Sequence, residues 1–265
     1  MKDFPKLTWH NVIEDPSKER NENSTSHRGV TMVIDKGVPL QYFIDYLILC
    51  SKYIDVIKLG FGTSALYPID ILKEKIKVAK QFDITIVPGG TFMEVAILHN
   101  KVDTYLATCE QYGFNGIEIS DGTISLSVKE RNALIKKAIR PHWKVITEYG
   151  KKIWGSSLQV DAFIDTVQSD LTAGSSFVII EGRETGKGVG IYDDEGKADQ
   201  EKLHLVEKKL GSMNHIMWEA PLKSQQVFFI QSYGANVNLG NICYDDVLAL
   251  EWIVNRKLDN FFKVS

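Results

Sequence analysis

Cysteine is scarce in this chain of 265 residues, and its three cysteines, Cys50, Cys109 and Cys243, lie far apart. No CxxC spacing occurs, and three isolated cysteines do not make a disulfide framework. The six histidines are also scattered and form no pair at metal-ligand spacing. These absences exclude disulfide-stabilised scaffolds and zinc-ribbon proteins, and they leave the cysteines as reduced core residues.

The chain also lacks an excess of positive charge and any long apolar run. Its formal net charge of −3 and pI of about 6.1 give no electrostatic reason to bind nucleic acid. No stretch approaches the roughly 18 apolar residues of a membrane span, and the amino terminus has no apolar signal core. We therefore expect a soluble, cytoplasmic protein with no nucleic-acid or membrane partner.

What the sequence does contain is a repeated pattern of short apolar runs, about 25 to 35 residues apart, with helical periodicity between them. The runs lie at 30–34, 54–59, 84–87, 116–120, 145–147, 177–180, 215–218 and 236–239. Strands that alternate with helices indicate an α/β fold with a parallel sheet. An open doubly wound sheet is the alternative, but no strand is followed by GxGxxG with an acidic residue about 20 positions on.

We therefore predict a single (β/α)₈ TIM barrel over residues 29–265, preceded by a polar, partly mobile arm over residues 1–28. Two small domains would also fit this length. In a barrel, the carboxyl ends of all strands meet at one rim. Charged residues at these predicted ends are Asp35, Lys58, Glu94, Glu118, Glu148, Lys152, Arg183, Glu184 and Glu219. Exposed loops are charged in any protein, so the charges alone do not define a site.

Two stretches at the predicted rim have a more specific pattern. Alternation along 116–120 places Glu118 opposite Ile117 and Ile119, and a glutamate that points into a barrel needs a partner or a metal. After the strand at 145–147 come Glu148, a glycine and two lysines, of which Lys152 can reach back over the strand end. The glycine-rich segment 186–190 is either a loop over the rim or a phosphate cradle, although it lacks the Gly-Lys-Ser/Thr ending of a P-loop.

Taken in order, these strand ends resemble the phosphosulfolactate synthase family, which also includes plant heat-stress-associated relatives. The resemblance covers about residues 30–252. The matching segments are Ile34-Asp35-Lys36-Gly37, Ile57-Lys58-Leu59-Gly60-Phe61-Gly62-Thr63, Gly89-Gly90-Thr91 with Glu94, Ile117-Glu118-Ile119-Ser120, Glu148-Tyr149-Gly150-Lys151-Lys152, Glu181-Gly182-Arg183-Glu184, Trp218-Glu219-Ala220-Pro221 and Val237-Asn238-Leu239-Gly240-Asn241-Ile242.

The resemblance implies a (β/α)₈ barrel that adds sulfite to phosphoenolpyruvate with Mg²⁺, giving (2R)-3-phosphosulfolactate. It also implies that Lys152 is the general acid, and Lys58 is the rival candidate. The chain departs from the family at Tyr149, where valine is usual, and at 253–258, where a Leu-Arg-x-Gly-Leu-Arg pattern is usual. The second departure leaves two alternatives open: a non-catalytic stress-associated barrel, and an aldolase-like enzyme acting on another small phosphorylated acid.

Our candidate metal ligands are carboxylates at successive strand ends, because oxygen ligands suit Mg²⁺. They are Glu118, Glu148 and Glu184, and each could instead be the ion-pair partner of a lysine or arginine. The candidate substrate-binding residues are Arg183, Lys223, Gly89, Gly90, Asn238 and Asn241. A catalytic lysine works best with its pKa near the working pH, which Lys151, Arg183 or partial burial could arrange for Lys152. We further expect a homo-oligomer, such as a trimer.

Overall fold

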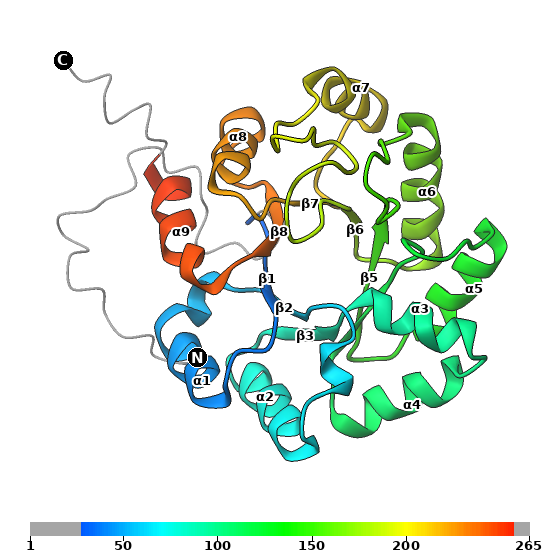
Figure 1. Cartoon of the computed structure of the whole chain (residues 1–265), viewed down its shortest axis with the longest axis vertical. Coiled ribbons are helices and arrows are strands. Elements are labelled where there is room, and N and C mark those ends of the chain that lie inside the picture. Colours follow the sequence, from blue (N-terminus) through cyan, green and yellow to red (C-terminus); the bar gives the residue numbers. More distant parts are fainter. Residues whose placement is uncertain (1–27, 257–265) are drawn as a thin grey trace.

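Parallel strands form the centre of the fold in our computed structural model, which describes residues 28–256 (Figure 1). The strands are β1 (Thr31–Asp35), β2 (Val56–Leu59), β3 (Thr85–Pro88), β4 (Gly116–Ile119), β5 (Lys144–Tyr149), β6 (Phe177–Ile180), β7 (Ile216–Glu219) and β8 (Asn238–Ile242). They make one eight-stranded sheet in the order β3-β2-β1-β8-β7-β6-β5-β4, so the first and last strands of the chain are neighbours. The predicted (β/α)₈ barrel is confirmed.

The predicted strands are all present, and their bounds shift by a few residues at most. β8 shows the largest shift, because 236–239 was predicted and the strand runs from Asn238 to Ile242. Gly240 and Asn241 are typical of turns, and here they form an irregularity in the strand: the register with β1 shifts between the pairs Thr31–Leu239 and Val33–Ile242, while Gly240 still pairs with β7. The predicted arm, apart from Arg28, and residues 257–265 lie outside the described residues, so the division between arm and barrel stays a prediction.

The barrel closes between β3 and β4, the two ends of the ladder, through a side chain. The Ile86 amide donates to Asn115 Oδ1 at 2.7 Å, and Asn115 Nδ2 donates to the Ile84 carbonyl at 3.1 Å. Gly116 lets the strands approach closely, since a Cβ there would lie 2.8 Å from both Thr85 Cγ2 and Val87 Cγ1. An asparagine amide thus takes the place of a strand ladder at this seam.

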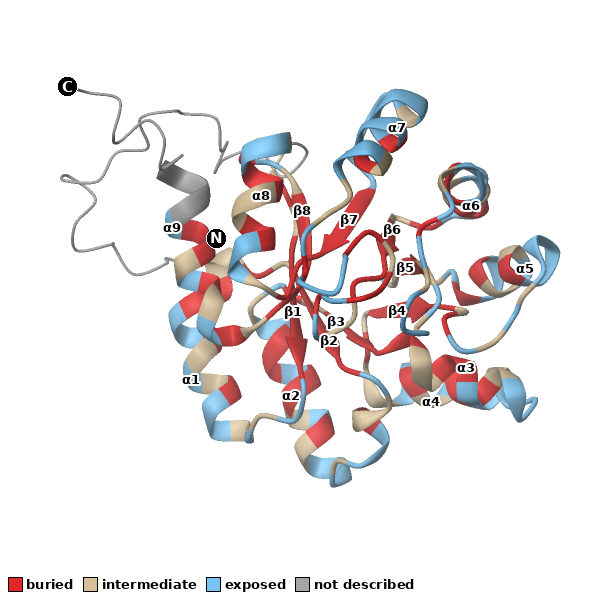
Figure 2. Cartoon of the chain, turned by 45° about the horizontal axis from the view of Figure 1, so that its top comes forward, coloured by how far each residue is buried: buried red, intermediate tan, exposed pale blue. Residues whose placement is uncertain are grey.

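Helices surround the barrel and bury one face each against it (Figure 2). They are α1 (Leu40–Cys50), α2 (Ile69–Gln81), α3 (Gly90–Leu98), α4 (Val102–Tyr112), α5 (Val128–Ala138), α6 (Val160–Ala173), α7 (Gln200–Leu210), α8 (Lys223–Tyr233) and α9 (Val247–Arg256). The start of α5 follows from its sequence, because Ser127 and Glu130 cap each other's backbone amides. Among the described residues, no helix has the length and apolar character needed to cross a membrane.

The barrel interior consists of two layers. An apolar layer contains Met32, Val56, Val87, Ile146, Ile179 and Met217. Side chains two residues apart in a strand point to the same face. The positions two residues after Val56, Ile146, Ile179 and Met217 are Lys58, Glu148, Glu181 and Glu219, and all four are buried. We call Lys58, Glu118, Glu148, Glu181 and Glu219 the charged layer; it lies at the carboxyl end of the strands.

Candidate active site at the carboxyl ends of the strands

Lys58 ties three of the four glutamates of the charged layer together. Its Nζ lies 2.7 Å from Glu219 Oε1, 3.2 Å from Glu118 Oε2 and 3.4 Å from Glu148 Oε2. The lysine side chain is 6% exposed and each glutamate side chain 1%. Buried charges persist only when they are paired, and this shared ammonium supplies the pairing. The expectation that Glu118 points into the barrel and has a partner there is confirmed.

Lys152 lies on the more open side of the same cluster. Its Nζ is 2.7 Å from Glu148 Oε1, 3.2 Å from Glu181 Oε2 and 3.4 Å from the Thr91 hydroxyl. Its side chain is 19% exposed, against 6% for Lys58. Gly150 has a φ of +134°, a conformation that glycine adopts readily, and it turns the chain so that Lys152 returns over the end of β5.

The pKa values of both lysines are raised by the neighbouring carboxylates. Burial favours the neutral form of Lys152, but the carboxylates of Glu148 and Glu181 outweigh it and raise the pKa of Lys152. Burial likewise opposes the charge on Lys58, whose pKa is nevertheless raised well above its usual range by Glu118, Glu219 and Glu148. The predicted lowering of the Lys152 pKa is therefore wrong. Both ammonium groups are protonated at neutral pH.

The carboxylates respond unequally to the shared environment. Burial raises the pKa of Glu118 to about 7, against the pull of Lys58. Burial also raises the pKa of Glu181 well above its usual range, and the charges of Glu148 and Glu219 add to the effect. Burial acts in the same direction on Glu148, but Lys152 and Lys58 overcome it and lower the pKa of Glu148. Four ionised carboxylates would exceed the charge of the two lysines, and the raised pKa values of Glu118 and Glu181 reduce that excess.

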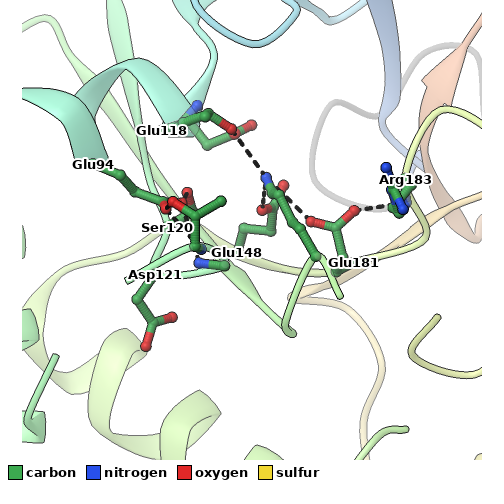
Figure 3. Close-up of polar contacts among 12 residues, drawn as sticks. Glu94, Glu118, Ser120, Asp121, Glu148, Glu181 and Arg183 are labelled. Carbon is green, nitrogen blue, oxygen red and sulfur yellow. Dashed lines mark hydrogen bonds and ion pairs between the residues drawn. The ribbon is translucent and has the colours of Figure 1, made fainter. Parts of the chain in front are cut away.

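Three of these carboxylates form a group that could hold a metal ion. One oxygen from each of Glu148, Glu181 and Glu219 lies within 4.8 Å of the others, and all three residues are buried. Backbone amides orient two of these carboxylates. Gly182 N donates to Glu219 Oε2 at 2.8 Å, and Arg183 N donates to Glu181 Oε1 at 2.6 Å. Figure 3 shows Glu118, Glu148 and Glu181 turned toward one common space.

Comparisons with known proteins show the family of this chain. Residues 18–256 match the family model for ComA, (2R)-phospho-3-sulfolactate synthase. The chain belongs to this family. The phosphosulfolactate synthase of Methanocaldococcus jannaschii is 46% identical over 241 residues, which are 89% of this chain and 95% of that protein. The phosphosulfolactate synthase of Bacillus subtilis is 36% identical over 246 residues, 91% of this chain and 95% of that protein.

Solved structures with low identity match the fold alone. KGPDC from Streptococcus mutans, in complex with D-R5P, has a TM-score of 0.54 at 16% identity and covers 89% of this chain and 98% of its own. The YdjI aldolase of Escherichia coli K12 also has a TM-score of 0.54, at 14% identity, covering 92% of this chain and 91% of its own. These likenesses support the barrel and say nothing of the substrate.

The structure brings the predicted metal ligands only partly together. Glu148 belongs to the acidic triad, whereas Glu118 is held by Lys58 and by the Gly90 amide at 2.7 Å. Glu184 is half-buried in the loop after β6 and is not part of the triad. Sequence reasoning missed Glu181 as a ligand, although alternation from Ile179 places it on the inward face.

The glycines after β3 serve packing. A Cβ on Gly89 would lie 2.6 Å from the Phe61 carbonyl oxygen, and one on Gly90 would lie 2.8 Å from Glu118 Oε1. Their amides are also engaged, since Gly89 N donates to the Leu59 carbonyl and Gly90 N to Glu118. The two glycines let the start of α3 approach the charged layer closely.

Of the two candidate asparagines, the structure brings only Asn241 to the rim. Asn241 Nδ2 donates to the Arg183 carbonyl at 3.2 Å, and its buried Oδ1 has no hydrogen-bond partner in the described part of the chain. Both Asn241 and Arg183 have φ values near +55°, at +54° and +57°. Such backbone strain in residues other than glycine is often found at functional sites.

Asn238 lies instead at the first position of β8, at the opposite end of the barrel. Its Oδ1 accepts from Val30 N at 2.9 Å, and its Nδ2 donates to the carbonyls of Asn214 and Ile216. These contacts use both groups of its amide, so its prediction as a substrate-binding residue is not supported. Lys223 is exposed at the first position of α8, in the loop region after β7.

The glycine-rich segment after β6 is a loop that packs on the loop after β5. Gly186, Gly188 and Gly190 all have positive φ, between +63° and +66°. Their amides donate to the carbonyls of Gly182, Asp193 and Ser156 respectively. These three amides are therefore occupied within the protein, which argues against a phosphate cradle of the P-loop kind.

A cavity of about 620 Å³ lies outside the barrel, between α2, α3 and α4. Its walls are mostly apolar and include Leu72, Phe92 and Tyr105. None of the candidate site residues lines it. Charged substrates are bound by charged and hydrogen-bonding groups, so the chemistry belongs to the charged layer and not to this cavity.

Proposed function

We propose that this protein adds sulfite to phosphoenolpyruvate in a reaction that depends on Mg²⁺ and forms a carbon–sulfur bond. The observation that supports this most is the position of Lys152: its ammonium lies between Glu148 and Glu181, two of the three residues that could hold a metal ion. A proton donor thus lies beside a site for a cation. Family membership indicates the product, and this geometry offers ligands for the cation and a donor for the proton.

The acidic triad fits a small divalent cation with oxygen ligands. Four buried carboxylates, of Glu118, Glu148, Glu181 and Glu219, face two lysines, so a dication would balance the charge of the cluster with all four carboxylates ionised. Carboxylate oxygens without nearby histidine or cysteine ligands favour Mg²⁺ over softer metals. We propose Glu148, Glu181 and Glu219 as the ligands, in place of the set that included Glu118 and Glu184. A bound Mg²⁺ stabilises negative charge that develops on the substrate carboxylate.

In the proposed reaction, the sulfur lone pair of sulfite attacks the methylene carbon of phosphoenolpyruvate. The electrons of the carbon–carbon double bond move toward the carbon that bears the phosphate and its carboxylate, and that carbon then takes a proton. The phosphate stays on its oxygen, so the product is phospho-3-sulfolactate. We propose that Lys152 Nζ donates this proton, because it is protonated and is the more exposed of the two lysines.

Lys58 has a different role in this proposal. With three carboxylates within 3.4 Å of its Nζ and only 6% of its side chain exposed, it is enclosed by protein. It holds Glu118, Glu148 and Glu219 in place and reduces their mutual repulsion. This assigns the acid role to Lys152 and the positioning role to Lys58, a choice that the sequence alone left open.

Both substrates are anions, and cations at the rim would attract them. Arg183 is half-buried at the mouth of the barrel, and Lys223 is exposed at the start of α8. We propose both as binding residues. We also propose Asn241, whose Oδ1, unpartnered in the described part of the chain, would accept a hydrogen bond from a protonated group of the substrate and not contact an anionic oxygen. Gly89 and Gly90 contribute by letting the start of α3 pack closely against the site.

Phosphorus-31 NMR tests this proposal directly. Purified protein would be mixed with phosphoenolpyruvate, sulfite and Mg²⁺, and a new phosphate-ester signal should replace that of phosphoenolpyruvate. Omitting sulfite or removing Mg²⁺ with a chelator should prevent the change. No new ester with every component saturating would contradict the proposal and favour a non-catalytic barrel. A new ester that forms equally well without sulfite would show that sulfite is not the group added, and would also contradict the proposal.

A further inference from the structure

Glu94 is a buried carboxylate near the site that the proposed reaction does not use. It lies on α3 with no exposed surface, and it accepts hydrogen bonds from four donors in the segment after β4 (Figure 3). The donors are the hydroxyls of Ser120 and Thr123 and the amides of Gly122, at 3.1 Å, and Thr123, at 2.8 Å. The two Glu94 oxygens thus serve as an anchor for this segment, which we call the 120–123 segment.

The 120–123 segment lies directly against the side chain of Lys152. A Cβ on Gly122 would be 2.8 Å from Lys152 Cγ, 3.1 Å from Cδ and 2.9 Å from Cε. The Lys152 amide also donates to the Gly122 carbonyl at 3.1 Å. Contact therefore runs along the middle of the lysine chain, and not only at its flexible end. Because Gly122 has no side chain, the Lys152 side chain lies directly against its backbone. We call this space beside Gly122 the trough.

The segment is also held from its other side, independently of Glu94. Lys151 Nζ donates to the Asp121 carbonyl at 2.7 Å, and Arg131 forms an ion pair with the Asp121 carboxylate at 3.0 Å. These contacts attach the loop to the barrel through Asp121. Gly122 and Thr123 are held by Glu94, which accepts from the amides of both residues and from the Thr123 hydroxyl.

We propose that Glu94 is a positioning residue for Lys152, acting through the 120–123 segment. The proposal rests on the role of Lys152 as proton donor. A lysine side chain has four rotatable bonds, and holding it in one conformation has a cost in entropy. Proton transfer needs the donor within hydrogen-bond reach of the carbon, and an error of about 1 Å can lower the rate about 10²-fold. The trough, fixed by Glu94, holds the ammonium in place.

The first test is a double-mutant cycle with Gly122→Ala and Lys152→Met. Gly122→Ala alone should lower kcat about 10- to 100-fold and leave the KM for phosphoenolpyruvate within about threefold, because binding does not need the lysine in one conformation. In the Lys152→Met background, Gly122→Ala should cause no further loss, because no lysine remains to be positioned. Equal losses in the two backgrounds would overturn the proposal.

The second test does not depend on placing a larger residue in the trough. Thr123→Val removes one hydroxyl donor to Glu94 at nearly constant volume, whereas Thr123→Ser keeps it. We expect kcat about threefold to tenfold lower in Thr123→Val and restored in Thr123→Ser, with Glu94→Gln showing a larger loss than Thr123→Val. Equal activity of Thr123→Val and Thr123→Ser would contradict the proposal.

The same measurements separate this inference from the proposed function. Turnover near wild type in Lys152→Met would reject Lys152 as proton donor and remove the basis of this inference with it. A large loss in Lys152→Met, combined with additive losses for Gly122→Ala, would reject the positioning role alone. Thermal unfolding of each variant checks that a loss of kcat does not come from unfolding.

Discussion

The apolar and charged layers of the barrel lie on the same strands and on the same face, two residues apart. Ile146 precedes Glu148, Ile179 precedes Glu181 and Met217 precedes Glu219. All of them are buried. The apolar layer stabilises the fold by removing hydrocarbon from water, whereas the charged layer has a desolvation cost that only its ion pairs offset. The difference shows that one pleat of each strand separates the residues that stabilise the barrel from those proposed to act in catalysis.

If the layers differ in this way, changes in or beside the charged layer should affect turnover, and changes in the apolar layer should affect only stability. Lys152→Met, at the edge of the charged layer, should lower kcat by about 10² to 10⁴ and leave the affinity for phosphoenolpyruvate largely intact. Steady-state kinetics and a binding titration measure the two quantities. Lys77→Met, a change in an exposed lysine of α2, is the matched control and should change neither. Turnover near wild type at saturating substrate would reassign the acid role to Lys58.

Lys58→Met should be the most destabilising change within the charged layer. Removing the ammonium leaves Glu118, Glu148 and Glu219 buried without their shared partner, and we expect a loss of about 3 to 5 kcal/mol in the free energy of unfolding. Urea unfolding measures this loss. Adding Glu219→Gln to Lys58→Met should recover part of it, since one uncompensated charge is then gone. An unchanged urea midpoint would show that the carboxylates do not depend on Lys58.

Glu181→Gln tests the metal site of the charged layer. If Mg²⁺ binds the acidic triad of the folded protein, then Mg²⁺ at about 100 times its Kd should stabilise the wild type by about 2.7 kcal/mol. Glu181→Gln removes one ligand and should lose most of this gain. Glu184→Gln, three residues along the same loop, is the matched control and should keep it. The reverse result would restore Glu184 as a ligand.

Ile179→Val is a change in the apolar layer, two residues before Glu181, and we expect the smallest effect from it. The loss of one buried methyl group should lower the free energy of unfolding by about 0.5 to 1.5 kcal/mol, with kcat unchanged. Urea unfolding and steady-state kinetics on the same preparation would show both. A tenfold fall in kcat would mean that the two layers are not separable.

The sequence predicted the barrel and several members of the site because strand alternation determines which side chains point inward. It correctly brought together Lys58, Glu118, Glu148 and Lys152. It did not identify the full acidic triad, because Glu184 was chosen after β6 although alternation from Ile179 leads to Glu181. Glu184 follows a turn in which Arg183 has positive φ. That turn is not visible in the residue types. Asn238 was misplaced because the shift of β8 moves it to the base of the barrel.

The direction of the lysine pKa shifts was also beyond the sequence. Two opposing effects act on Lys152, and their balance depends on the 2.7 Å and 3.2 Å distances to Glu148 and Glu181. Lys151 precedes Lys152 in the chain and was therefore expected to affect the pKa of Lys152. In the structure, the Lys151 ammonium instead donates to the Asp121 carbonyl. The expected homo-oligomer stays a prediction, which light scattering on the purified protein would test.

The central claim is that the charged layer holds a divalent cation beside Lys152. Crystals grown with Mn²⁺, which accepts the same oxygen ligands as Mg²⁺, would test it through anomalous scattering. Our account predicts one strong anomalous peak at the mouth of the barrel, in contact with Glu148, Glu181 and Glu219. A map with no peak among these three carboxylates at saturating Mn²⁺, or with its peak at other residues, would contradict it.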